Sequence, residues 1–293
     1  MMEILKKMTW LSFIVIVIGF IFLYLLKSNV KETIIFFPID ENIMYETAFT
    51  SIKDVEKENH THTIDWKTSS ILPEKAFLRQ DISLLYINGR LVDKMGKWEQ
   101  QTNSLKQEKK LKDIDSGKLE SISFHYSEIH RPENEYRSVQ QMSSDYLYVV
   151  NSSIDSLQSF KQANNSDEKE WKETLDKITK ETLNESWKKG FKKFHIQPSH
   201  YDPYLLTEMA PYSFQPLKGF SKQQADEIIG KLWEGLYKEY FIKIRKEDGT
   251  TIDSIDSTIP LILISKNKDH LLVLFETSEG EPILLRQQIE GLN

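Results

Sequence analysis

The longest unbroken run of hydrophobic residues in the chain lies near its N-terminus. Residues 8–26 carry no charged side chain, and Trp10 and Tyr24 stand near the two ends of the run. A helix rises about 1.5 Å per residue, so the run is long enough to cross the roughly 30 Å hydrocarbon core of a bilayer. The pattern predicts one transmembrane anchor after a short cytoplasmic tail, residues 1–7, with aromatic rings at the headgroup level.

The flanking residues bear on the fate and the orientation of this anchor. The apolar run is longer than that of a removable signal peptide, and no small-residue cleavage site follows it, which indicates a retained signal anchor. Two lysines precede the run and two follow it, so the local charge does not decide its orientation. Because long domains are exported largely regardless of charge, we expect a single-pass protein of the cell membrane with its N-terminus in the cytoplasm and its large domain outside.

Extended segments follow the anchor. The membrane-proximal segment, residues 27–63, contains an apolar run at Thr33–Ile39 that predicts a first strand, and a polar stretch at residues 56–63 that predicts a loop. The clearest local signal comes later, where Asn88 and Gly89 separate two apolar runs. This pair supplies the positive φ values of a type I′ turn, so we predict a two-residue hairpin there.

Further strands are predicted from alternation of polar and apolar residues. In Leu119–Tyr126, residues such as Ile122 and Phe124 face one side while polar residues face the other. Asp145–Val150 predicts another strand. Residues 94–118 show no regular apolar period, and we expect a partly helical or exposed excursion. Together these segments predict an antiparallel sheet of four or five strands.

Two segments show the spacing of amphipathic helices. The first is expected to begin with Ser166 as its N-cap and to end at Gly190, with one narrow apolar stripe. The second is expected to begin at Ser221, because Gln224 three residues later completes a capping box. Both helices are predicted to bury one face.

The chain ends in a predicted meander. It consists of three apolar runs separated by turns, residues 259–264, 271–275 and 283–289. The whole pattern predicts an α+β fold, in which an N-terminal transmembrane helix precedes an extracytoplasmic domain, residues 64–293. The domain divides into candidate sub-lobes, residues 64–150 and 151–293. The pattern leaves open whether the terminal strands join the first sheet or form a second lobe.

Composition narrows the class of function. The formal net charge is −6, which argues against a nucleic-acid-binding protein, since such proteins present a basic face. The chain contains no cysteine, so disulfides, thiolate nucleophiles and cysteine metal sites are excluded. An anchored domain without cysteine fits a bacterial cell envelope best.

Familiar catalytic motifs are absent from the sequence. There is no G-x-S-x-G, H-E-x-x-H or G-x-G-x-x-G pattern. Gly230 and Gly235 have the outer spacing of a phosphate-binding loop, but Leu236 and Tyr237 stand where such a loop needs Lys and Ser or Thr. We interpret both glycines as sites of close packing in a helix.

Two polar clusters resemble metal-binding patterns. His125, Glu128 and His130 are weak candidates for zinc ligands at the end of a strand, and His60 and His62 are candidates for a further ligand. The simpler interpretation is a polar strand face followed by a loop. A second set, Asp113, Asp115, Gly117 and Glu120, resembles a shortened calcium loop. A surface turn is the preferred interpretation of that set, and we predict no cofactor.

The stretch Phe191–Phe220 is the best single candidate for a binding site. It is rich in aromatic residues, histidine and proline, and it has no regular period. A long irregular segment inside a domain is often functional, and rigid aromatic rings bind peptides or sugars at low entropic cost. The candidate binding residues are His195, His200, Tyr201, Tyr204, Tyr212 and Phe214. Alternatively, these rings pack the segment over the core between the two helices.

These observations lead to one hypothesis and two alternatives. The hypothesis is a non-enzymatic, single-pass protein whose extracytoplasmic domain binds another protein or a cell-wall component. The first alternative is an anchored metal-dependent hydrolase of envelope polymers, with His125, Glu128 and His130 activating water. The second alternative is a membrane-tethered regulator whose domain faces the cytoplasm.

Overall fold

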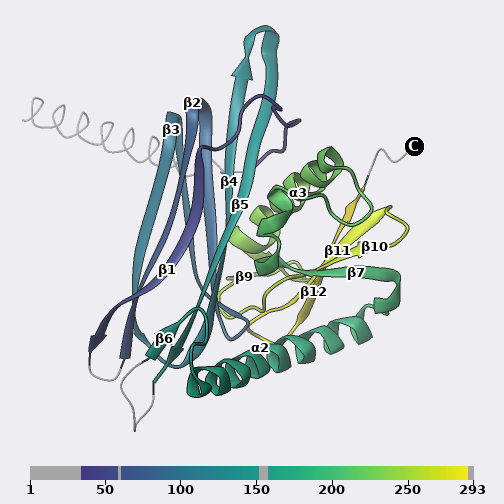
Figure 1. Ribbon diagram of the computed structural model, residues 1–293. Helices are drawn as coiled ribbons and strands as arrows, with labels where there is room; N and C mark the ends of the chain where they lie inside the picture. Colours follow the sequence, from purple (N-terminus) through teal and green to yellow (C-terminus); the bar gives the residue numbers. More distant parts are fainter. Residues whose placement is uncertain (1–33, 59–60, 152–157, 290–293) are drawn as a thin grey trace, which may run out of the picture. The chain divides into compact units, whose positions relative to one another are not determined.

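The computed structural model describes residues 34–58, 61–151 and 158–289 (Figure 1). The predicted anchor at residues 8–26 lies outside these ranges, and so does His60. Among the helices in the described ranges, none is both long and apolar enough to cross a membrane. Antiparallel sheets and two principal helices make up the described chain, which confirms the α+β class.

Six strands of the described chain form the first sheet. They are β1 (Thr47–Glu58), β2 (Thr61–Ile87), β3 (Arg90–Ile114), β4 (Gly117–Arg131), β5 (Glu135–Val150) and β6 (Gln158–Phe160). The order across the sheet is β1-β2-β4-β5-β6, and β3 pairs with β2. The sequence pattern did not reveal β1 or β6, so the sheet is larger than predicted.

The long strand β2 connects two layers. β1 pairs with its first part, Thr61–Ile71, whereas β4 pairs with its last part, Leu78–Ile87. The ladder between β2 and β3 changes register between these two parts. Side chains of β1 contact those of β4 without backbone pairing, since Thr50 Oγ1 lies 2.6 Å from Ser123 Oγ. Therefore β1 and the first part of β2 pack face to face against β4 and β5, and a space that we call the interlayer space lies between them.

The predicted hairpin is confirmed. β2 and β3 are joined by Asn88 and Gly89, whose φ angles are 49° and 84°. These positive values are those of a type I′ turn, in which asparagine and glycine are favoured. The backbone carbonyl of Gly89 also accepts a hydrogen bond from Ile259 N, so the turn contacts the C-terminal part of the chain.

Two predictions for the first half of the chain are wrong. Residues 94–118 are mostly strand, because β3 continues to Ile114. Its solvent-facing positions are polar, and pairing with β2 holds it extended despite the missing apolar period. Thr33–Ile39 makes no regular strand among its described residues, where only Ile39 forms an isolated bridge with Ser138. The predicted loop at residues 56–63 contains the ends of β1 and β2, and its centre lies outside the described ranges.

The two principal helices begin close to their predicted starts. α2 (Ser166–Lys193) has Asn165 rather than Ser166 as its N-cap, and it continues three residues past Gly190. α3 (Lys222–Leu236) has the predicted capping box between Ser221 and Gln224. A π-helical turn, η5 (Tyr237–Ile242), continues α3.

The C-terminal meander is confirmed, and it forms a second sheet. The meander consists of β10 (Leu261–Ser265), β11 (His270–Glu276) and β12 (Pro282–Gln288), and β7 (Tyr201–Leu205) is the fourth strand of the second sheet. The order across the sheet is β12-β11-β10-β7, and every pair is antiparallel. The terminal strands therefore do not join the first sheet.

Short elements complete the described chain. They are η1 (Pro132–Asn134), η2 (Pro198–His200), η3 (Leu206–Glu208), η4 (Ala210–Ser213), β8 (Ile244–Arg245) and β9 (Thr251–Ile252). β8 and β9 pair only with each other. The segment predicted to be irregular therefore contains the edge strand β7 and three short helices.

The helices cover the two faces of the second sheet. α2 packs on the face that carries Leu263 and Leu272, where Trp187 and Phe191 contact them. α3 lies between the other face and β5 of the first sheet (Figure 1), and Gln287 Nε2 donates to the carbonyl of Ile228. On its opposite side, α3 presents residues to β4 and β5. The fold thus creates an α2 face and an α3 face on the second sheet.

Candidate functional site

A hollow of about 360 Å³ lies on the α2 face, where the end of α2 meets the second sheet. Its lining brings together three histidines, a tyrosine and an arginine. They are His195, His200, Tyr201, His270 and Arg286. We call this hollow the histidine groove. Three of the six binding residues predicted from the sequence, His195, His200 and Tyr201, line it.

The end of α2 places the first of these histidines. Ile196 N donates to the carbonyl of Phe191, and His195 has a φ of 53°. This is the Schellman arrangement, in which the residue after the helix adopts the left-handed conformation. Glycine or asparagine usually occupies that position, so a histidine there is held in a costly conformation. Backbone strain of this kind is frequent at functional sites.

Strands β7 and β11 place the other groups. Tyr201 begins β7, and its hydroxyl lies 3.1 Å from Nε2 of His270, the first residue of β11. The other ring nitrogen of His270, Nδ1, lies 2.7 Å from Asp269 Oδ1. The side-chain hydrogen bonds of Ser265 and His270 lower the pKa of Asp269, so this carboxylate stays ionised. The chain of contacts fixes the orientation of the Tyr201 and His270 rings.

The groove suits a negatively charged group. Its lining contains one guanidinium and three imidazoles, and no carboxylate lines it. Among the described residues, no carboxylate forms an ion pair with Arg286. Leu272 and Leu284 form the apolar floor. An arginine beside apolar and aromatic surface is the combination that binds carboxylates in protein interfaces.

The other three predicted binding residues lie elsewhere. Tyr204 points to the α3 face, because alternate residues of β7 face opposite sides. It packs edge to face against Tyr212, with ring centroids 5.2 Å apart. Phe214 is 71% exposed and does not line the histidine groove. The structure therefore divides the predicted set between two faces of one sheet.

His270 and Arg286 were missed by the sequence interpretation. Both lie on strands of the C-terminal meander, which the sequence predicted. Residues 272 and 286 are direct partners, so Leu272 and Arg286 share a face. The alternation within each strand was visible in the sequence, whereas the proximity of these strands to the end of α2 was not.

The weak zinc candidates do not converge. His125 is completely buried in the interlayer space, whereas Glu128 and His130 lie on the opposite face of β4. Glu128 Oε1 contacts His130 Nε2, and the ring of Phe77 stacks on His130 at 3.7 Å. His62 is buried against Asp54 at 2.8 Å. In the part of the chain that the structure describes, no group of three His, Cys, Asp or Glu residues is arranged to hold a metal ion.

The residues of the calcium-like pattern form the turn between β3 and β4. Asp115 Oδ1 accepts a hydrogen bond from Ser116 N at 2.8 Å. Glu120 instead lies within β4, buried, with Lys118 Nζ 3.2 Å away. Its carboxylate therefore points into the protein core and not into the turn. This placement agrees with the surface-turn interpretation and not with a calcium loop.

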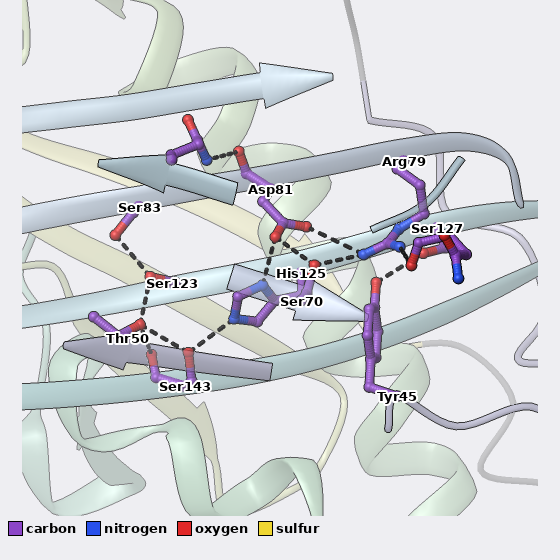
Figure 2. A network of polar contacts seen from close by, with 12 residues as sticks. Tyr45, Thr50, Ser70, Arg79, Asp81, Ser83, Ser123, His125, Ser127 and Ser143 are labelled. Atoms are coloured by element: carbon purple, nitrogen blue, oxygen red, sulfur yellow. Dashed lines mark hydrogen bonds and ion pairs between the residues drawn. The ribbon is translucent and has the colours of Figure 1, made fainter. Parts of the chain in front are cut away.

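A buried polar network fills the middle of the interlayer space (Figure 2). His125 is its centre, because its Nδ1 lies 2.8 Å from Asp81 Oδ2 and its Nε2 lies 2.8 Å from Ser143 Oγ. Ser70 Oγ donates to Asp81 at 2.6 Å, and Arg79 donates to Ser70. These contacts join β2, β4 and β5.

Both layers contribute to this network. Thr50 of β1 contacts Ser123 of β4 and Ser143 of β5, as Figure 2 shows. Tyr45, which precedes β1, lies 2.8 Å from Ser127 Oγ and stacks below the Arg79 guanidinium. Burial raises the pKa of Tyr45, so its hydroxyl stays protonated and can donate. Apolar clusters around Trp66 and around Leu72 close the two ends of the space.

The order carboxylate, imidazole, hydroxyl in Asp81, His125 and Ser143 is the order that activates serine in hydrolases. A nucleophilic serine also needs space beside its oxygen for a substrate carbonyl and oxyanion donors. Thr50 Oγ1 instead lies 2.7 Å from Ser143 Oγ and 2.6 Å from Ser123 Oγ. The contacts therefore favour a brace between layers, because Thr50 of β1 joins Ser123 of β4 and Ser143 of β5.

A larger hollow, of about 710 Å³, lies between the segment before β1 and the end of the β4–β5 hairpin. Both arginines in its lining are already paired within the protein. Arg131 Nη2 lies 2.8 Å from Asp40, and Arg137 Nε lies 2.6 Å from Glu135. This pairing leaves less charge for a ligand than the histidine groove offers.

The sequence matches no protein-family model, and no curated protein or solved structure matches it either. The function of the histidine groove is therefore inferred from its own residues.

Proposed function

We propose that this protein is a single-pass membrane protein of a bacterial cell envelope whose extracytoplasmic domain binds an acidic partner. Residues 8–26 act as the anchor, and the histidine groove is the binding site. The observation that carries the proposal is the Arg286 guanidinium, which forms no ion pair with a described carboxylate and lies beside three imidazoles, in a lining without a carboxylate. The proposed role is capture, not catalysis.

The architecture of the groove supports this proposal. His195 is held in a left-handed conformation, and Tyr201 and His270 hold each other in place. Binding groups that are rigid before binding lose little entropy when a ligand arrives. An acidic side chain at Arg286 that also covers Leu284 gains both charge pairing and apolar contact.

The sidedness of the domain has a direct test. Protease added to intact cells should degrade the domain, because the proposal places it outside the membrane. Protection in intact cells, with degradation only after lysis, would favour the cytoplasm-facing regulator instead.

Occupancy of the groove has a second test. A photoreactive phenylalanine analogue placed at His200, which is exposed in the groove, should form a defined covalent adduct in living cells on illumination. The same analogue at Lys110, an exposed residue of β3, is the matched control. Equal adduct yields at the two positions, or none at His200, would remove the groove as the binding site.

A further inference from the structure

The strand β12 is an open edge of the second sheet. It pairs with β11 on one side, and within the described chain no strand pairs with its other side. Ile289 N donates to the carbonyl of Asp269, and Thr277 N donates to the carbonyl of Glu281. In an antiparallel ladder, residues whose backbone N–H and C=O groups bond to the neighbouring strand alternate with residues whose backbone groups point away from that strand. The backbone groups of Leu284, Arg286 and Gln288 therefore point to the open edge.

The opposite edge of this sheet is blocked. Leu206 N donates to the carbonyl of Pro260, and Lys266 N donates to the carbonyl of His200, so even-numbered residues of β7 face β10. Pro203 consequently occupies an outward position in the middle of β7, where it offers no N–H donor. Proteins commonly protect sheet edges in this way. On β12, the only proline is Pro282, at the start of the strand, and the other outward N–H groups of β12 donate to no backbone carbonyl of the described residues.

A hollow lies on each side of this open edge. The histidine groove is on the α2 face, and Leu284 and Arg286 of β12 line it. On the α3 face, a hollow of about 740 Å³ separates β12 from α3, and we call it the α3 groove. Gly235 lines it, and a Cβ added there would meet nothing within 4 Å.

The two grooves differ in the side chains that they suit. In the α3 groove, Lys231 pairs with Glu227 and Lys238 pairs with Glu234, each at 2.8 Å. These pairs neutralise the lysines. Glu239 and Arg286 also line the α3 groove, and Val273 and Leu285 form its apolar part, against which an aliphatic side chain can pack. The histidine groove suits an acidic side chain, because no carboxylate in the described part of the chain pairs with its Arg286.

We propose that β12 binds an extended segment of a partner protein, which adds antiparallel to the open edge as a fifth strand. The segment alternates acidic and aliphatic residues, because successive side chains of a strand face opposite sides. Its acidic residues face the histidine groove and its aliphatic residues face the α3 groove. This inference rests on the proposed function, and it names a polypeptide as the partner because only a polypeptide supplies a matching ladder of backbone hydrogen bonds.

The test uses a fluorescent seven-residue peptide that alternates valine and glutamate, with the full-length protein in detergent micelles. Fluorescence anisotropy should show saturable binding. A peptide with lysine in place of glutamate should bind at least tenfold more weakly. Absence of binding by the valine–glutamate peptide, or equal binding by the lysine peptide, would overturn the proposal.

Methylation of the peptide amides distinguishes strand addition from simple charge attraction. In the antiparallel arrangement, the peptide residue directly opposite Arg286 has its side chain on the same side of the sheet and exchanges backbone hydrogen bonds with Arg286. Glutamates occupy such positions, so their amides point to β12. Methylating those amides should weaken binding at least tenfold, whereas methylating the valine amides should change it less than threefold. Equal effects would contradict the ladder.

Two variants at one position provide the protein side of the test. Arg286→Ala removes the charge and should weaken binding about fivefold. Arg286→Pro also removes the outward N–H, at a position that does not serve the pairing with β11, and should weaken binding at least tenfold further. Equal affinities of the two variants would show that no backbone bond forms there.

Failure of this inference differs from failure of the proposed function. If the His200 photoadduct forms in cells but the peptide does not bind, a partner occupies the groove without adding a strand, and the inference falls alone. If neither is observed, both fall. Binding of an acidic polysaccharide, such as polygalacturonate, as tightly as the peptide would replace the polypeptide with a cell-wall polymer.

Discussion

The most unusual residues of this protein are the ionisable ones buried inside its first sheet. Arg79, Asp81 and His125 are all fully buried, and each hydrogen-bonds to a neighbouring polar group. Burying a charge is costly unless partners compensate for it, so such groups are sensitive to the loss of one partner. Here Asp81, His125 and Ser143 lie on three different strands, and the network therefore makes the packing of the two layers specific.

A double-mutant cycle tests this coupling. Asp81→Ala and His125→Ala should each lower the free energy of unfolding by about 3–5 kcal/mol, because each leaves a buried polar partner without compensation. The double variant should cost less than the two single effects together, with a coupling of about 1.5–3 kcal/mol. Denaturant unfolding of the full-length protein in detergent measures all three. Effects that add to within about 0.5 kcal/mol would contradict the brace.

Glu120 offers a prediction about pH. Burial raises the pKa of this carboxyl, against the opposing effect of Lys118. A raised pKa in the folded state means that protonation of Glu120 stabilises the fold. This stabilisation is complete below the ordinary carboxyl pKa, and it is lost as the pH rises through the raised pKa of the folded state. Glu120→Gln should therefore gain stability relative to the natural protein as pH rises from about 4 to 7. A constant difference across this range would show that Glu120 does not titrate with folding.

At the residue scale, the sequence predicted three of the five polar residues that define the candidate site. His195, His200 and Tyr201 lie within ten positions of one another, so their unusual composition was visible in one stretch. Arg286 approaches them only through the pairing of β11 with β12. His125 was visible as a polar residue on a strand, but the partner Asp81 lies 44 positions earlier, on a neighbouring strand. Such long-range neighbours follow from topology and not from local pattern.

At the scale of elements, two glycines in helices have opposite roles. A Cβ at Gly190 of α2 would lie 2.5 Å from Leu274 Cδ1, and Leu274 is fully buried in β11. Glycine therefore permits the close approach of α2 to the second sheet. Gly235 of α3 has open space instead, so the prediction of close packing there is wrong. The prediction of close packing is confirmed at Gly230, since a Cβ there would lie 2.1 Å from Phe36.

This contrast gives a matched pair of substitutions. Gly190→Ala should destabilise the protein by about 1–2 kcal/mol, because overpacking outweighs the gain in helix propensity. Gly235→Ala should stabilise it by about 0.5–1 kcal/mol through propensity alone. The midpoints of denaturant unfolding compare the two variants with the natural protein. Stabilisation by both substitutions would show that α2 does not approach β11 closely.

Elements with local signals were predicted well. The Asn88-Gly89 turn and the capping box at Ser221 each depend on a few neighbouring residues, and both are present. The continuation of β3 through residues 94–114 was missed because that sequence carries no apolar period, and its pairing partner β2 holds it extended. The end of α2 was placed too early, because Gly190 serves packing and His195 provides the left-handed residue after the helix.

At the scale of the whole described domain, the α+β class followed from the sequence, whereas the assembly of the sheets did not. β1 packs across the interlayer space onto β4 and β5, and α3 lies between β5 and the second sheet (Figure 1). Tyr201 and Tyr204 fall on opposite faces of β7 because successive residues of a strand face opposite sides. These two tyrosines are both half-buried, on the same strand, and only Tyr201 lines the histidine groove.

The central claim is that the histidine groove binds a partner outside the cell membrane, and the tyrosine pair tests it most directly. The yield of the photoadduct at His200 in living cells should be measured with Tyr201→Ala and with Tyr204→Ala, after thermal unfolding has shown that both variants are folded. Our account predicts that Tyr201→Ala lowers the yield at least fivefold, while Tyr204→Ala leaves it within a factor of two. Equal yields from the two variants would contradict it.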